Sequence, residues 1–182
     1  MNYGGGDLRT RIVGARLLST SHSPYFYKWN PKDTEFYLDP GDQAGRKVNG
    51  NVVTPATLYM LYPLSQLNYY TIIILWNVFQ IISGIAVTLL LTRKKSYAEY
   101  CIPLAIVIIG LICSETWLYN IERCQMYIFY TLIFSIMYRT YLSRLKHNEF
   151  ISGFIGGLFI LFRPFSGIVG LGFLLYWRKK WI

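Results

Sequence analysis

Uncharged apolar stretches alternate with short polar segments along most of the chain. The longest of them, residues 70–91, holds 22 residues without one charged side chain. At about 1.5 Å per residue, a helix of that length crosses a hydrocarbon core of about 30 Å. Helices of soluble proteins are seldom apolar on every face over such a distance. The pattern therefore predicts an integral membrane protein in which 70–91 is the first long membrane-spanning helix.

Four further apolar segments follow, at 97–117, 124–142, 150–162 and 165–177. The last two are short, since the 13 residues of each form only about 20 Å of helix. One continuous helix over both would bury Arg163 in the middle of the bilayer, which is energetically costly. We therefore expect a hairpin that turns at Arg163-Pro164. Residues 70–182 are predicted to form an all-α transmembrane bundle.

Residues 1–69 are more polar and are predicted to form a loop with helices of its own. Apolar side chains recur at helical spacing over 8–19, which indicates an amphipathic helix lying on the membrane surface. The side chains that fall away from its apolar stripe are Arg9, Arg11 and Arg16. A second apolar stretch, before residue 67, is broken by Pro63 and is too short to span. It is expected to be an interfacial or half-buried helix.

The distribution of basic residues orients this topology. The net charge is +9, and nine of the 18 Lys and Arg lie in three clusters at 93–95, 139–146 and 178–180. Each cluster borders an apolar segment, which is typical of cytoplasmic loops. Basic flanks account for the charge without nucleic acid. We expect a multi-pass protein of the plasma (inner) membrane, in contact with the lipid bilayer, whose loop 1–69 is extracytoplasmic.

The N-terminus raises a question of translocation. The first 20 residues contain no apolar core, so they do not form a signal peptide. A polar loop that long needs a segment to carry it across the membrane. We therefore expect a transmembrane helix upstream of Met1 and a protein longer than this chain.

The cysteines and histidines predict neither a disulfide framework nor a metal site. The three cysteines, Cys101, Cys113 and Cys124, have no ligand spacing, and two of them lie within an apolar segment. The two histidines, His22 and His147, have no partner nearby in the sequence. No metal and no cofactor is expected.

With the basic clusters inside, five polar residues come to the outer face of the membrane. They are Asp7, Glu122, Arg123, Gln125 and Arg163. A carboxylate there takes a proton from an acceptor hydroxyl as a general base. A cation neutralises the charge of a leaving phosphate, and the fork of a guanidinium donates two hydrogen bonds to one lipid phosphate.

Each of these residues also has a structural explanation. Asp7 would solvate a loop or cap a helix that begins at Leu8, because Asp is a favoured N-cap. Glu122-Arg123 would be a solvated turn pair. Arg163 would extend to the interface from a helix end. The residues alone leave these alternatives open.

Several short motifs follow one another in a recognisable order. The first group is Gly6-Asp7-Leu8, Gly14-Ala15-Arg16-Leu17-Leu18, Ser23-Pro24-Tyr25, Asn49-Gly50, Val53-Thr54-Pro55, Tyr62-Pro63-Leu64 and Trp76. The second is Glu122-Arg123-Cys124-Gln125-Met126-Tyr127, Gly156-Gly157 and Arg163-Pro164. In their order and spacing the chain resembles the membrane glycosyltransferases of the GT-C superfamily. The most similar branch is related to bacterial polyprenyl-phosphate-mannose-dependent mannosyltransferases.

The resemblance implies a reaction and roles for the residues. Asp7 would be the catalytic base in the first extracytoplasmic loop, and Arg163 and Gln125 would face the donor phosphate or sugar, with Glu122 and Arg123 beside them. A hexose such as mannose would move from polyprenyl phosphate to a hydroxyl of a glycolipid or glycan, without nucleotide, metal or cofactor. Cys124 departs from the family, which usually has Gly there. Family members are also usually longer.

Two other functions remain open. One is a non-catalytic membrane protein, the product of a truncated or split gene. The other is a lipid or solute transporter. Transporters tend to carry polar groups at mid-depth and inverted repeats, whereas the span 70–91 holds only Asn77 and Gln80 near its centre and the chain shows no repeat.

Overall fold

The computed structural model describes residues 5–39, 51–92 and 97–168, and these are helical, with no strand. The helices are α1 (Gly6–Leu17), α2 (Pro55–Ser65), α3 (Tyr69–Leu91), α4 (Tyr97–Cys113), α5 (Glu115–Arg123), α6 (Tyr127–Tyr141) and α7 (Asn148–Phe162). Two short 3-10 helices, η1 (Glu35–Tyr37) and η2 (Pro164–Ser166), accompany them. The all-helical class expected from the sequence is confirmed for the described residues.

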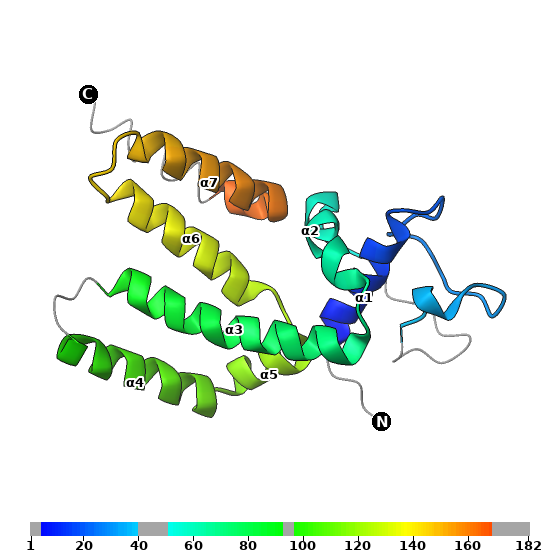
Figure 1. Cartoon of the computed structure of the whole chain (residues 1–182), viewed down its shortest axis with the longest axis horizontal. Coiled ribbons are helices and arrows are strands. Elements are labelled where there is room, and N and C mark those ends of the chain that lie inside the picture. Colours follow the sequence, from blue (N-terminus) through cyan, green and yellow to red (C-terminus); the bar gives the residue numbers. More distant parts are fainter. Residues whose placement is uncertain (1–4, 40–50, 93–96, 169–182) are drawn as a thin grey trace.

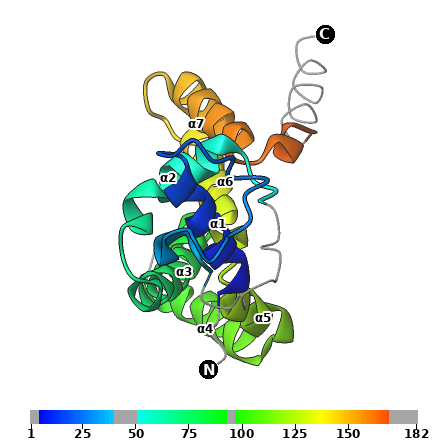
Figure 2. The ribbon, with the colours of Figure 1, turned by 90° about the vertical axis from the view of Figure 1, so that its right-hand side faces the viewer.

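The long helices form one layer, in the spatial order α4, α3, α6, α7 (Figure 1). Helices α3 and α6 run in the same direction, α4 and α7 run opposite to them, and α1 and α2 lie across one end of the layer (Figure 1). The view onto that end shows α1 and α2 in front of the layer (Figure 2). Helix α3 begins there, α5 and α7 end there, and α6 starts there. This end carries the candidate site.

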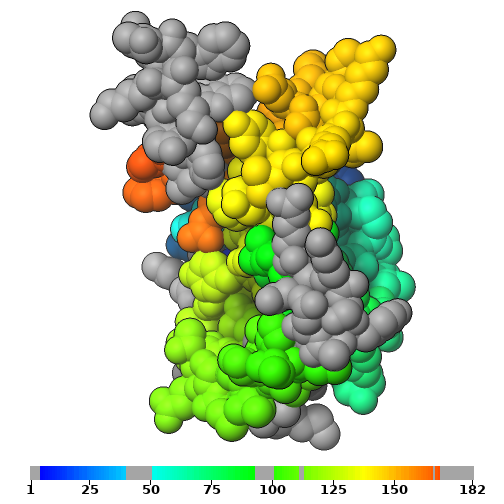
Figure 3. Space-filling model, turned by 90° about the vertical axis from the view of Figure 1, so that its left-hand side faces the viewer, coloured from blue at the N-terminus to red at the C-terminus, as the bar shows by residue number. Residues whose placement is uncertain are grey.

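The opposite end holds the connection between α6 and α7, which projects in yellow and orange in Figure 3. The basic side chains of this connection, Arg144 and Lys146, are exposed. A basic cluster and the candidate site therefore lie at opposite ends of the layer, and the membrane orientation remains a prediction. The clusters at 93–95 and 178–180 lie outside the described residues.

Helix α3 has the length and composition of a membrane span. It has 23 residues, and Asn68 caps its start by accepting a hydrogen bond from the backbone N–H of Thr71 at 2.8 Å. In the described part of the chain it is the one helix that is by itself long and apolar enough to cross a membrane. Helices α4 and α5 are long and apolar enough only when taken together, and they are bent by 70° relative to one another. The apolar α7 has 15 residues and is shorter than a span. The multi-span bundle remains a prediction.

The predicted segment 97–117 is divided into two helices. The chain breaks at Ser114, whose backbone is extended (φ −85°, ψ 117°) and whose side chain caps α5. Helix α5 then ends at Cys124, which has a left-handed backbone (φ 52°). For that reason α6 begins at Tyr127, three residues after the predicted start of the segment 124–142. The predicted segment 165–177 is described only to residue 168, and η2 begins one residue before it, at Pro164.

The buried core joins the N-terminal helices to the layer. Leu8, Ile12 and Ala15 of α1 pack against Leu58 and Leu61 of α2, Ile72 and Trp76 of α3, and Cys124 and Met126 of the α5–α6 turn. Burial of this apolar surface stabilises the arrangement. It also holds the start of α1 against the turn between α5 and α6.

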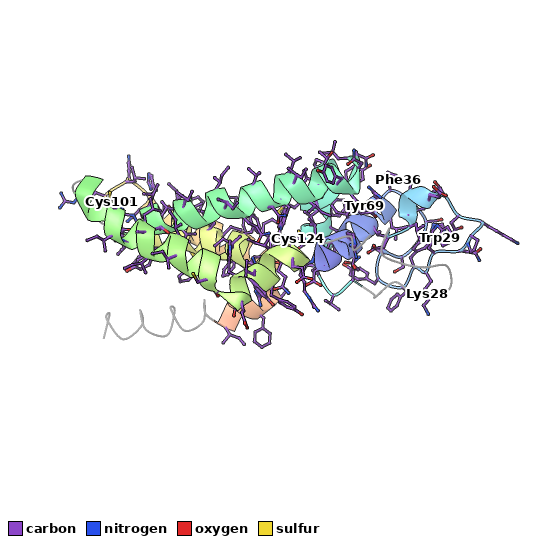
Figure 4. The ribbon with its side chains drawn as sticks, turned by 90° about the horizontal axis from the view of Figure 1, so that it is seen from below. Lys28, Trp29, Phe36, Tyr69, Cys101 and Cys124 are labelled. Carbon is purple, nitrogen blue, oxygen red and sulfur yellow. The ribbon has the colours of Figure 1, made fainter. Side chains whose placement is uncertain are left out.

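Arg16 corrects the predicted orientation of the first helix. We expected its side chain to face away from the apolar stripe, but it is only 4% exposed. The guanidinium donates to the backbone carbonyls of Ser65 (2.7 Å), Phe36 (2.8 Å) and Leu67 (3.0 Å). It also lies over the rings of Phe36 (4.3 Å) and Tyr69 (4.4 Å), which Figure 4 shows close together. Segments from outside α1 therefore cover its polar side as well.

Candidate active site

Asp7 occupies the first turn of α1, which begins at Gly6. The residue before the helix, Gly5, has a left-handed backbone (φ 75°), and its N–H donates to the carbonyl of Glu122. A carboxylate in the first turn is favoured by the helix dipole. No side chain caps this helix, so the suggested role of Asp7 as the N-cap of a helix from Leu8 is wrong.

Gln125 contacts Asp7 directly. Its side-chain Nε2 donates to Oδ2 of Asp7 at 3.0 Å. The backbone of Gln125 is itself held, because its N–H donates to the carbonyl of Asn120 (3.0 Å) and its carbonyl accepts from Nε1 of Trp76 (3.4 Å). The α5–α6 turn thus orients the carboxylate of a helix that lies more than a hundred residues earlier.

Arg163 lies just beyond the end of α7. Its backbone is extended (φ −140°, ψ 87°), as expected for the residue before a proline. The guanidinium lies over the rings of Tyr127 (5.1 Å) and Tyr130 (5.2 Å) on α6, a cation–π arrangement that stabilises the side chain. The side chain is exposed. It remains accessible while its direction is set by α6.

Helix α2 holds the end of α7 in place. The hydroxyls of Thr54 and Thr57 both donate to the carbonyl of Phe162, each at 3.3 Å. Phe162 also packs edge-on against Phe129 of α6, with ring centroids 5.9 Å apart. Because Arg163 follows directly, these contacts position it from two sides.

Arg11 also belongs to this group, and the sequence reasoning missed it. It lies one turn after Asp7 on α1, and its Nη1 atom is buried without a hydrogen-bond partner among the described residues. Burial lowers the pKa of the Arg11 guanidinium. Tyr130, Asp7 and Tyr127 raise this pKa and so partly oppose the effect of burial, whereas the positive charge of Arg163 lowers it further. The spacing of four residues from Asp7 to Arg11, which places both on one helix face, was the available signal.

Glu122 and Arg123 lie at the edge of the group. Both side chains are exposed on the last turn of α5. Arg123 lies over the ring of Tyr119 at 4.4 Å, and Glu122 reaches the site through its backbone carbonyl. The structure thus brings together Asp7, Gln125 and, across Tyr127, Arg163.

A cavity of about 320 Å³ opens beside the group, between α4, α5 and α6. Its lining includes Trp117, Ile128 and Tyr127 and is mostly apolar. Tyr127 is shared, because its ring also lies beneath Arg163. Tyr127 therefore connects the cavity to the cationic part of the site.

The cysteines lie apart, and the described residues contain no group of three or more metal-binding side chains. Figure 4 shows Cys101 at the far end of the layer and Cys124 beside α1. Cys124 is buried, and Cys101 and Cys113 are exposed.

Comparison with known proteins agrees with the helical fold. The chain matches the model of glycosyltransferase family 87 over residues 53–182. No curated protein and no solved structure gives a match. The matched residues include Gln125 and Arg163, whereas Asp7 and Arg11 precede them. The resemblance to GT-C enzymes is confirmed at the level of the family, and the finer mannosyltransferase branch is a proposal. Because the match covers more than two thirds of the chain, the protein belongs to glycosyltransferase family 87, a family of the GT-C type.

Proposed function

We propose that the protein transfers a hexose, with mannose as the first candidate, from a polyprenyl-phosphate donor to a hydroxyl of a glycolipid or glycan. Family membership implies glycosyl transfer. The donor, the acceptor and an extracytoplasmic site are our extension. The observation that carries the proposal is the carboxylate of Asp7, held by Gln125 at 3.0 Å in a group that also contains Arg163.

The arrangement suits an inverting displacement. Asp7 takes the proton of the acceptor hydroxyl as that oxygen attacks the anomeric carbon of the donor sugar. The bond from the anomeric carbon to the phosphate oxygen breaks, and the prenyl phosphate leaves with the electron pair. Arg163 neutralises the charge that develops on the phosphate. The hydrogen bond from Gln125 holds the Asp7 carboxylate in a fixed orientation.

The cavity beside Tyr127 supports a lipid donor. A prenyl chain is apolar, and the mostly apolar cavity of about 320 Å³ is lined by Tyr127, whose ring also lies beneath the guanidinium of Arg163. A donor lying there would present its phosphate to the cation and its lipid to the cavity. The apolar α3, which is long enough to span a bilayer, fits a substrate that is delivered from the membrane.

Transport is less well supported. Polar groups that line a transport path need access to water or solute. Gln80 is fully buried and is hydrogen-bonded on both sides, to Asn120 and to Asn77 (3.3 Å). The polar centre of α3 is therefore occupied by one hydrogen bond within α3 and one to α5.

The test is sugar transfer in membranes that carry this chain. Labelled polyprenyl-phosphate mannose is the donor, polyprenyl-phosphate glucose tests the sugar, and a nucleotide sugar tests the donor class. Asp7→Asn keeps the size of the side chain and a hydrogen-bond acceptor for Gln125, and loss of a general base lowers the rate by about 10²–10⁴-fold. Glu149→Gln, an exposed carboxylate at the other end of the layer, is the control.

Each outcome has a distinct meaning. Transfer that depends on Asp7 and not on Glu149 supports an enzyme with Asp7 as base. Transfer that persists in Asp7→Asn would show that the protein is an enzyme but that Asp7 is not its general base. Absence of transfer from every donor, with the protein present and folded, would support the non-catalytic alternative.

A further inference from the structure

Arg11 and Arg163 approach the same space from different elements. Asp7 and Arg11 share one face of α1, since they are four residues apart. Gln125, which contacts Asp7, lies two residues before Tyr127, and Arg163 lies over the ring of Tyr127. Arg11 and Arg163 also influence one another electrostatically. Arg11 therefore lies near both Asp7 and Arg163.

Arg11 differs from the other arginines of its helix. Arg9 forms an ion pair with Asp39 at 2.9 Å. Arg16 donates to three backbone carbonyls. Arg11, in contrast, has a buried Nη1 with no acceptor among the described residues. A buried donor left without an acceptor is unfavourable by about 1–3 kcal/mol, so the site is suited to an added anion.

We infer that Arg11 and Arg163 together bind the phosphate group of the prenyl-phosphate donor. This inference rests on the proposed function. A guanidinium donates two parallel hydrogen bonds to a phosphate, and here two guanidinium groups come from separate elements, α1 and the residue that follows α7. Asp7 lies one helical turn from Arg11 on the same face of α1, so the general base and the phosphate-binding cation belong to one helix.

The reaction itself gives a reason for two cations. The donor phosphate is a diester with one negative charge, and the leaving prenyl phosphate is a monoester with about −1.5 to −2 near pH 7. A second guanidinium therefore interacts more strongly with the leaving group than with the donor. Interactions of that kind accelerate the chemical step.

Binding of farnesyl phosphate to the full chain in lipid nanodiscs tests the inference. Tryptophan fluorescence is a direct signal, because Trp117 lines the cavity and Trp76 contacts Gln125. Farnesol is the uncharged comparison, and inorganic phosphate tests the headgroup without the lipid. The variants are Arg11→Met, Arg11→Lys, which keeps the charge, and Arg144→Met, which removes an exposed charge at the other end of the layer.

Arg11→Met is expected to weaken farnesyl phosphate binding at least about tenfold and to leave farnesol binding unchanged. Arg11→Lys should recover part of the loss, and Arg144→Met should bind as the wild type does. A misfolded variant would lose binding of farnesyl phosphate and of farnesol equally. The ratio of the affinities for these two ligands therefore identifies the phosphate contact. Unchanged binding of farnesyl phosphate by Arg11→Met, or equal loss of both ligands by an Arg11→Met protein that is folded, would overturn the inference and leave Asp7-dependent transfer standing. A wild type that binds farnesol as tightly as farnesyl phosphate would overturn it as well. If transfer were absent while phosphate binding still depended on Arg11, the proposed function would fail and the anion site would stand.

Discussion

Nε2 of Gln125 lies 3.0 Å from Oδ2 of Asp7, although 118 positions separate the two residues in the chain. The contact joins the first turn of α1 to the turn between α5 and α6. Each partner is held by its own backbone, Asp7 by the helix and Gln125 by its bonds to Asn120 and Trp76. The carboxylate is thus oriented by a rigid donor.

Gln125→Met tests this contact, because it removes the donor with little change in size. Asp7 would lose one hydrogen bond of about 1 kcal/mol and its fixed direction. We expect sugar transfer to fall about tenfold, mainly in kcat, with a small change in thermal stability. Gln66→Met is the matched control, since Gln66 is exposed at the end of α2. Equal rates for the two variants would remove Gln125 from any positioning role.

Gly5 also positions Asp7, because its backbone conformation sets the start of α1. Its φ of 75° is unfavourable for other residues, and an added Cβ would lie 3.2 Å from Cγ1 of Ile73 and 3.3 Å from Sγ of Cys124. Gly5→Ala is expected to lower the free energy of unfolding by about 1–3 kcal/mol. At Gly6 a Cβ meets nothing within 4 Å, so Gly6→Ala should be neutral or slightly stabilising. Thermal unfolding in detergent, followed by circular dichroism, compares the pair. Similar midpoints would show that the left-handed backbone is not required.

The sequence predicted the helical class and the end of the layer at which Asp7, Gln125 and Arg163 lie. Apolar length and basic flanks are local patterns, so they can be interpreted from one segment at a time. The group around Asp7 depends on contacts between distant segments. Nothing near Arg11 in the sequence indicates that it lies close to Tyr127 and Tyr130 of α6 and to Arg163. Glu122 and Arg123 fit the same topological argument but have exposed side chains, because topology selects an end of the bundle and not a helix face.

The predicted helix boundaries were wrong where the local backbone conformation ends a helix inside an apolar segment. Residues 97–117 are apolar enough to be one helix, but Ser114 caps a new one. Cys124 is in the left-handed conformation that usually favours glycine. The position where the family resemblance expects Gly is therefore the position where the backbone turns. The departure noted from the sequence coincides with a real geometric requirement.

Arg16 is expected to be important for stability, not for chemistry. Arg16→Met would leave three backbone carbonyls without their donor, and each unpaired buried group is unfavourable by about 1–3 kcal/mol. We expect the free energy of unfolding to fall by at least about 3 kcal/mol. Arg144→Met, at an exposed position, should change it by less than about 0.5 kcal/mol. Chemical unfolding in detergent measures both, and a small effect at Arg16 would contradict its role as a link between α1, η1 and α2.

Thr57→Val tests how α2 positions Arg163. The variant keeps the shape of the side chain and removes a hydroxyl that donates to the carbonyl of Phe162 at 3.3 Å. We expect a loss of about 1 kcal/mol in stability and a severalfold rise in the KM for the donor, because Arg163 follows Phe162. Thr57→Ser keeps the hydroxyl and should retain the donor KM. A donor KM that changes equally in both variants would assign the effect to packing instead.

Gln80 and Asn120 should behave as an energetically coupled pair. The side-chain amide of Asn120 donates to Oε1 of Gln80, and both residues are buried between α3 and α5. Gln80→Leu or Asn120→Leu alone leaves a polar partner unpaired, so each should destabilise the protein by about 1–3 kcal/mol. The double variant should destabilise it by about 1 kcal/mol less than the sum. A strictly additive result would mean that the two amides do not depend on one another. That result would contradict a role of this hydrogen bond in joining α3 to α5.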